Sequence, residues 1–205
     1  MKAKIQILLI SFLTLSSMES VSQTSWKIDK DKNGIQVFTR IVEGSDFKSF
    51  KAVTHLNASA TEIITILKNV DSYTKWYGYT KTSKLLKDEQ EVQYNYVETI
   101  FPWPYRNRDM VYKMSINASN PEEIKIILKG ISDYLPEKKG IVRMKKADGY
   151  LLLHSANNGT EVVYVFHSEP GDNVPAWLAN KSIAELPYKT LIGLRKTLKE
   201  QQVNK

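Results

Sequence analysis

The chain has 205 residues, a formal net charge of +7 and no cysteine. This length suggests a single domain, and the lack of cysteine excludes disulfides and thiolate metal sites. The core alone must therefore hold the fold, while the positive charge leaves contact with nucleic acid or an anionic membrane open.

The N-terminus has the residue order of a secretory signal. Met1 to Lys4 carries two lysines, Ile5 to Leu15 is an apolar run, and small and polar residues follow. This order predicts a signal peptide over residues 1–22, cleaved near Ser22–Gln23, and a mature protein that is periplasmic or secreted. A buried N-terminal helix is the alternative. Export makes nucleic acid a poor partner and leaves residues 23–205 as one domain, which we expect to be monomeric.

The domain begins with strands and then changes to a helical pattern. Residues 35–41 and 47–56 are β-rich runs, and a turn signal precedes the first. Ser59 to Glu62 is a capping box, in which the serine oxygen accepts from the N3 amide and the glutamate reaches back. The box predicts a helix to about residue 70, and a second short helix is expected to end near Trp76.

The middle of the chain is again β-rich. Turn residues separate most of the runs, and neighbours this close in sequence pair antiparallel because parallel crossovers need a dozen or more residues. The strand candidates are residues 92–100, 110–116, 123–129, 140–146, 150–156 and 162–168.

One long helix is expected from about Pro175 to Glu200. Its apolar residues, Trp177 and Leu191 among them, form one stripe beside a basic face. Pro187 predicts a kink because it removes a backbone hydrogen bond and clashes with the preceding turn. A long helix laid across a strongly curved sheet buries its stripe there. The expected fold class is α+β: a curved antiparallel sheet wrapped around the C-terminal helix, with two short helices inserted after the early strands.

Motifs of metal- and nucleotide-dependent enzymes are missing from the sequence. There is no Gly-rich phosphate loop, no Gly-x-Ser-x-Gly elbow and no His-Glu-x-x-His. The three histidines, His55, His154 and His167, are far apart in the chain. We therefore expect no cofactor, no metal and no catalytic residue.

The segment around residues 94–116 offers a candidate ligand site. Strand side chains alternate between faces, which puts Arg108 at the end of an apolar row and makes Glu98 its expected cross-strand neighbour on the concave side. Because a buried charge needs a partner, the two would form a polar contact at one end of an apolar cavity. A structural ion pair with nothing bound is the alternative. The candidate ligand contacts are Tyr94, Tyr96, Glu98, Arg108, Met110, Tyr112, Met114, Phe166, Trp177 and Leu191.

Four segments of the chain resemble START domains, the lipid-transfer domains related to the steroidogenic acute regulatory protein. They are Trp26 with residues 34–40, residues 59–76, Pro102-Trp-Pro104 with Arg108-Asp109, and residues 169–180 continuing to Leu194-Arg195. The resemblance implies a helix-grip fold with a tunnel for a lipid, sterol or other apolar molecule, usually without catalysis, and Arg108 matches the family's arginine. Little sequence precedes Trp26, so the family's first helix is expected to be shortened or missing.

Three functions stay open at this point. The first is a carrier that binds, and in one version transfers, a lipid-like molecule in an internal tunnel, with the C-terminal helix as its gate. The second is a cyclase/aromatase-type enzyme acting on a polyketide-like substrate, with Glu98, Arg108 or a tyrosine as acid or base. The third is an envelope interaction module without ligand. The basic helix face suits either transient contact with an anionic membrane or plain solvation.

Overall fold

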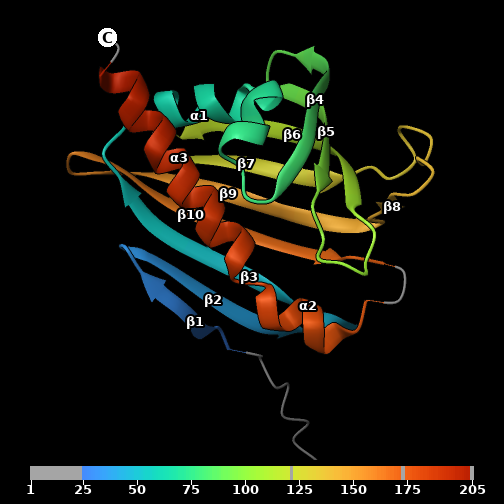
Figure 1. The fold of residues 1–205 in the computed structure, drawn as a ribbon. Coiled ribbons are helices and arrows are strands. Elements are labelled where there is room, and N and C mark those ends of the chain that lie inside the picture. Colours follow the sequence, from blue (N-terminus) through green and yellow to red (C-terminus); the bar gives the residue numbers. More distant parts are fainter. Residues whose placement is uncertain (1–24, 121, 172–173, 204–205) are drawn as a thin grey trace, which may run out of the picture.

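The computed structural model describes residues 25–120, 122–171 and 174–203, so the predicted signal peptide lies outside the described residues. The strands are β1 (Lys27–Lys32), β2 (Ile35–Val42), β3 (Ser45–Leu56), β4 (Thr80–Glu89), β5 (Val92–Thr99), β6 (Arg108–Asn120), β7 (Glu123–Gly130), β8 (Val142–Arg143), β9 (Lys146–Ala156) and β10 (Gly159–Glu169). They form one curved ten-stranded sheet in the order β1-β2-β3-β10-β9-β7-β6-β5-β4, with β8 beside β6 (Figure 1). The neighbours in this order pair antiparallel, as predicted.

Three parts of the sheet differ from the sequence prediction. The edge strands β1 and β4 were not predicted, because their mostly charged and polar residues lack the alternation of a half-buried strand. Lysines are common on edge strands, where they discourage pairing with other chains. Residues 140–146 were expected to form one strand, but Val142–Arg143 form β8, parallel to β6, and Lys146 already belongs to β9. Gly140, with a φ of +84°, precedes β8 in a conformation that no strand has.

The helices lie on the concave side of the sheet (Figure 1). They are α1 (Ala60–Lys68), the 3-10 helix η1 (Val70–Lys75), α2 (Ala176–Ser182) and α3 (Glu185–Val203). The predicted capping box is confirmed, since the Ser59 hydroxyl accepts from the Glu62 amide at 3.2 Å and the Glu62 carboxylate accepts from the Ser59 amide at 3.0 Å. The curved sheet, the two short inserted helices and the C-terminal helix together confirm the predicted fold class.

The C-terminal helical region is interrupted earlier than expected. The sequence predicts one helix kinked at Pro187, whereas the chain breaks at residues 183–184 into α2 and α3. Pro187 then falls in the first turn of α3, where a missing amide leaves no helical hydrogen bond unmade. The predicted kink is therefore wrong in position: the proline helps to begin a helix instead of bending one.

The register of the strands aligns one continuous row of apolar side chains on the concave face. Tyr164 of β10 lies opposite Ala52 of β3 and Leu151 of β9, and Leu151 lies in turn opposite Ile126 of β7. Each of these side chains is at most 4% exposed. Because residues opposite one another share a face, the row forms the floor on which α1 and α3 pack.

Helix α3 approaches the η1–β4 connection at backbone distance. A Cβ built on Gly193 would stand 2.0 Å from the carbonyl oxygen of Trp76. No side chain fits there, so only glycine allows the helix to pack this closely. The contact fixes α3 against Trp76, which is itself 6% exposed and belongs to the core.

Candidate functional site

A cavity of about 450 Å³ lies between the concave face of the sheet and the helices that cover it. Its wall combines aromatic residues with aliphatic ones from the sheet and from α3. The aromatic residues are Phe47, Phe50, Tyr73, Trp76, Tyr77, Tyr79, Phe101, Tyr112, Tyr164 and Phe166. This volume and this mainly apolar lining are typical of sites for small apolar molecules.

Tyrosine hydroxyls supply polar groups in the cavity wall. The hydroxyls of Tyr77 and Tyr164 are 2.6 Å apart and share a hydrogen bond, and Tyr73 donates to the Leu67 carbonyl at 2.6 Å. Burial raises the pKa of Tyr77 to about 12. Burial, followed by the neighbouring Tyr77, also raises the pKa of Tyr112 and of Tyr164. These hydroxyls therefore stay protonated near neutral pH.

The structure places five of the ten predicted ligand contacts in the cavity wall. They are Met110, Tyr112, Met114, Phe166 and Leu191. The other five, Tyr94, Tyr96, Glu98, Arg108 and Trp177, are not among the lining residues. That the five lining residues contact a ligand stays a prediction. The strand register and the side-chain contacts explain why the other five were predicted in the wrong place.

The concave face of β5 is the opposite of the predicted one. Glu98 lies opposite Asp109, and Thr99 lies opposite Arg108, so Glu98 and Arg108 are on different faces of the sheet. The row of Tyr94, Tyr96 and Glu98 is therefore convex, and β5 contributes Val97 and Thr99 to the cavity instead. The expected contact between Glu98 and Arg108 is wrong, because the register across the β5–β6 loop differs by one residue from the one assumed.

Glu98 and Arg108 each have other partners. Glu98 accepts from Lys81 at 3.0 Å and from Asn107 at 2.7 Å. Burial alone would raise the pKa of Glu98, but these hydrogen bonds leave that pKa lowered. The guanidinium of Arg108 donates to the carbonyls of Pro170 (3.1 Å) and Gly171 (3.3 Å) and lies over the ring of Phe101, at 4.4 Å from its centroid. Arg108 thus links β6 to the segment after β10. It lies behind Phe101 and Pro170, which line the cavity.

Trp177 also departs from its predicted position. It lies on α2, a helix in which no described residue is fully buried, and its side chain is 69% exposed. The separation of α2 from α3 turns it away from the stripe that includes Leu191, which is 1% exposed. The prediction of one apolar stripe assumed a single continuous helix. The break at residues 183–184 rotates α2 relative to α3, so residues of the two helices no longer share one face.

Sequence reasoning missed two groups. One is the aromatic set on and after η1, Tyr73, Trp76 and Tyr77, for which the aromatic run after the capping box was the available signal. The other is a buried ion pair outside the cavity. Arg143 donates to Asp109 at 2.8 and 3.1 Å and to the carbonyls of Ser132 and Leu135. It joins the loop after β7 to β6, and no sequence pattern pairs these residues.

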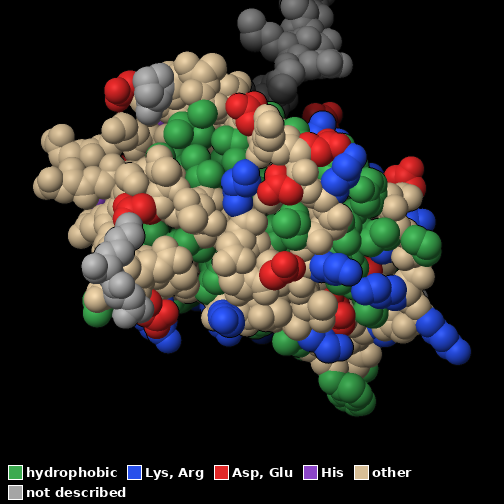
Figure 2. All heavy atoms as spheres, turned by 90° about the horizontal axis from the view of Figure 1, so that it is seen from above, with side chains coloured by type: hydrophobic (Ala, Val, Ile, Leu, Met, Phe, Trp, Pro, Cys, Tyr) green, Lys and Arg blue, Asp and Glu red, His purple; other side chains and the backbone are tan. Residues whose placement is uncertain are grey.

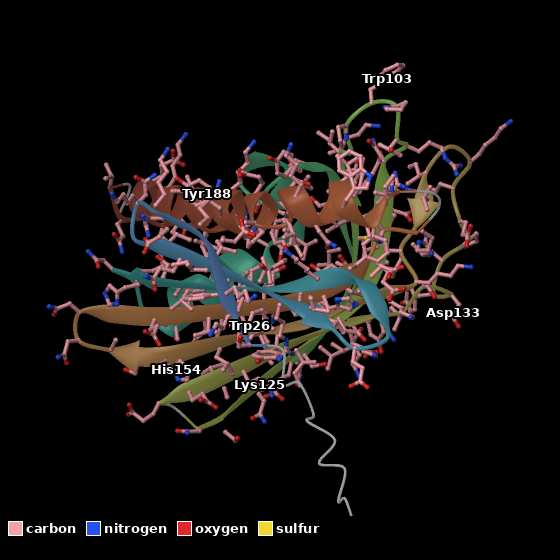
Figure 3. The ribbon with its side chains drawn as sticks, turned by 90° about the horizontal axis from the view of Figure 1, so that it is seen from below. Trp26, Trp103, Lys125, Asp133, His154 and Tyr188 are labelled. Atoms are coloured by element: carbon pink, nitrogen blue, oxygen red, sulfur yellow. The ribbon has the colours of Figure 1, made fainter. Side chains whose placement is uncertain are left out.

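One end of the cavity carries exposed aromatic and apolar residues. The lining there comes from the start of β3, from residues 99–102 and from residues 179–183. Next to these segments, Trp103 is 92% exposed at the tip of the β5–β6 loop and stands clear of the rest of the molecule (Figure 3). Ile100 is 50% exposed on the same loop. We call Ile100, Trp103 and Trp177 the aromatic rim.

The basic residues of the C-terminal helical region are partly engaged within the protein. Arg195 donates to the Asn33 carbonyl and to the Thr54 hydroxyl at 2.7 Å, and Lys189 lies over the ring of Tyr79. Seen from above, basic and acidic side chains are interspersed on the surface (Figure 2). Among the described residues, no helix is long and apolar enough to cross a membrane.

The fold and the cavity together define a helix-grip domain built around an internal apolar site. The START domain model matches residues 12–203, and the chain belongs to the START domain family. An uncharacterised protein of Pseudomonas aeruginosa is 34% identical over 171 residues, covering 83% of this chain and 85% of that protein. The phosphatidylcholine transfer protein of Mus musculus is 24% identical over 167 residues, covering 78% of each chain.

Solved structures agree with this assignment. The STAR-related lipid transfer protein of Xanthomonas axonopodis superimposes with a TM-score of 0.81 at 36% identity, covering 85% of this chain and 98% of that one. Human StAR-related lipid transfer protein 5 gives a TM-score of 0.77 at 16% identity, covering 86% and 88%, and shows the shared fold alone. The resemblance read from the sequence is confirmed.

Proposed function

We propose that the protein is a monomeric carrier that binds a lipid-like apolar molecule in this cavity and transfers it between membranes outside the cytoplasm. The observation that carries the proposal is the cavity itself, about 450 Å³ with a mainly apolar wall. Relatives named as lipid transfer proteins support the same reading. The export part rests on the signal-like order of residues 1–22.

Apolar burial is sufficient to hold such a ligand. Each buried methylene contributes about 0.8 kcal/mol, so a chain of roughly ten methylenes gains about 8 kcal/mol before the cost of association is subtracted. The ligand also covers apolar side chains of the cavity wall, such as Leu151, Leu191 and Leu194, and removing their surface from water adds to the binding free energy. The protein needs no charged contact to bind an alkyl chain.

A carrier fits the wall better than an enzyme does. Among the lining residues that the structure describes, the charged ones are Lys48 and Glu185, and both are partly exposed. Glu185 is paired with Lys30. General acid–base catalysis requires a group whose pKa lies near the working pH, whereas the pKa of Tyr77 is raised to about 12. The cavity thus offers shape and apolar contact, and little to drive proton transfer.

The aromatic rim is the proposed membrane contact. Tryptophan side chains prefer the interface between water and lipid, and Trp103 is the most exposed large apolar side chain of the described residues. Lys181 on α2 adds positive charge close to Trp177, which favours anionic lipid. Contact at this end would bring this part of the cavity wall to the membrane surface and shorten the path of the ligand through water.

Transfer between vesicles tests the proposal. Donor vesicles carry a self-quenched fluorescent lipid, acceptor vesicles carry none, and dequenching on adding protein reports transfer. We expect a rate that rises linearly with protein concentration and exceeds spontaneous exchange, and that increases when the vesicles contain anionic lipid. A protein that neither accelerates exchange nor retains lipid after removal of the vesicles would exclude the carrier function.

A further inference from the structure

The mainly apolar wall of the cavity carries a cluster of tyrosine hydroxyl groups, and this cluster limits the ligand. Tyr77 and Tyr164 share one hydrogen bond at 2.6 Å, which uses one of their two O–H protons. The other proton has no acceptor among the described residues. A buried donor without a partner is costly, so the pair calls for an oxygen atom supplied by a ligand or by water.

A second polar group lies close to this pair. The Asn95 side chain is fully buried, and neither its oxygen nor its nitrogen has a hydrogen-bond partner among the described residues. Asn95 lies opposite Tyr112 on the concave face, and Tyr112 lines the cavity together with Tyr77 and Tyr164. We call Tyr77, Tyr112, Tyr164 and Asn95 the hydroxyl cluster. Its three tyrosines belong to the cavity wall, and Asn95 lies beside Tyr112 on the same face of the sheet.

The charge of the hydroxyl cluster and the volume of the cavity limit the class of ligand further. No charged residue belongs to the hydroxyl cluster, and Arg108 is engaged with backbone carbonyls behind the wall. The two charged residues of the wall, Lys48 and Glu185, are partly exposed, and Glu185 is paired with Lys30. An ionised headgroup at the hydroxyl cluster would therefore lie among neutral groups, which is costly in an apolar site. The cavity of about 450 Å³ is in the lower half of the range of small-molecule pockets, about 300–1,000 Å³, which favours a lipid with one chain and a small head.

We infer that the ligand is an uncharged, single-chain-sized lipid with one hydroxyl or carbonyl oxygen, and that this oxygen binds at the hydroxyl cluster with the chain along the apolar wall. The inference rests on the proposed carrier function and specifies its ligand. It differs from what the phosphatidylcholine transfer proteins are named for, because a zwitterionic headgroup would find no charged partner at the hydroxyl cluster.

Four probes of matched chain length test the inference. They are tetradecanol, tetradecane, myristate and dimyristoylphosphatidylcholine, each presented from cyclodextrin to the purified protein, with bound ligand counted by native mass spectrometry. Tetradecanol should bind about tenfold more tightly than tetradecane, because it satisfies the free donor, and it should also exceed myristate at pH 8. Lowering the pH until myristate is neutral should bring its affinity close to that of tetradecanol.

Paired variants identify the cluster as the cause. The double variant Tyr77→Phe/Tyr164→Phe removes both partners of a hydrogen bond, a change that is often nearly neutral for stability. It should bring tetradecanol within threefold of tetradecane, because only the hydroxyl groups that distinguish the two probes are removed. Tyr150→Phe, on the convex face beside Lys125, is the matched control and should keep the wild-type preference.

The possible failures are distinguishable. Tighter binding of myristate at pH 8 or of the phospholipid would overturn the inference and leave the carrier function standing. The same holds if the double variant keeps the full preference for tetradecanol. Binding of none of the four probes would count against the carrier function and the inference together.

Discussion

Replacing Gly193 by alanine sets two effects of opposite sign against each other. Alanine is the better helix former by about 1 kcal/mol, so propensity alone predicts a more stable protein. The structure predicts the opposite, because the new Cβ would stand 2.0 Å from the Trp76 carbonyl oxygen and 2.8 Å from its carbonyl carbon. Helix α3 would have to move by more than about 1 Å to restore normal contact, and overpacking of this kind costs roughly 1–3 kcal/mol.

The expected net result is a loss of stability for Gly193→Ala, measured as the free energy of unfolding in urea. Lys196→Ala, an exposed site on the same helix, is the control and should change stability by less than about 0.5 kcal/mol. Because Trp76 and Leu194 both line the cavity, Gly193→Ala should weaken ligand binding as well. A Gly193→Ala protein as stable as the wild type would refute the close packing of α3 against η1.

Three further predictions concern charges and the aromatic rim. Asp109→Asn leaves Arg143 buried without its carboxylate and should cost roughly 3–5 kcal/mol in urea unfolding, whereas Asp148→Asn, at an exposed pair with Lys129, should cost about 1 kcal/mol or less; equal losses would contradict the buried pair. Trp103→Ala should reduce cosedimentation with anionic vesicles without changing Tm, whereas Trp26→Ala should not, and unchanged binding would remove the rim from the proposal. The pKa of Glu98 is lowered in the folded protein, so its contribution to stability is present above the unfolded pKa of about 4.3 and is lost as the pH falls through the folded pKa; Glu98→Gln should flatten this part of the stability profile, and an unaltered profile would argue against the Lys81 and Asn107 contacts.

Local patterns were enough to predict most of the fold. The Ser59–Glu62 capping box, the short spacing of the strands and the apolar C-terminal helix each depend on residues close in sequence. The edge strand β4 has no such pattern, because neither of its faces is consistently apolar. The position of the break between α2 and α3 depends on how the helical region packs on the sheet. A prediction made from Pro187 alone therefore put the interruption at the wrong residue.

The candidate site could be predicted only in part. Alternation along β6 correctly placed Met110, Tyr112 and Met114 in the wall, since the three follow one another on a single strand. The face of β5 depends on the register across the β5–β6 loop, which the sequence does not determine. Arg108 was misjudged for a different reason. Its partners include the backbone carbonyls of Pro170 and Gly171, more than sixty positions away in the chain, and no side-chain pattern indicates them.

The most direct test of the central claim is native mass spectrometry of lipid-loaded protein with two variants of neighbouring residues on β7. Leu128 is 7% exposed and lines the cavity, whereas Ile127 is 42% exposed. Leu128→Trp fills the cavity and Ile127→Trp adds the same side chain outside it. A carrier with its ligand in this cavity predicts one bound lipid for the wild type and Ile127→Trp, and none or far less for a folded Leu128→Trp. Equal lipid binding by all three would contradict the cavity as the binding site.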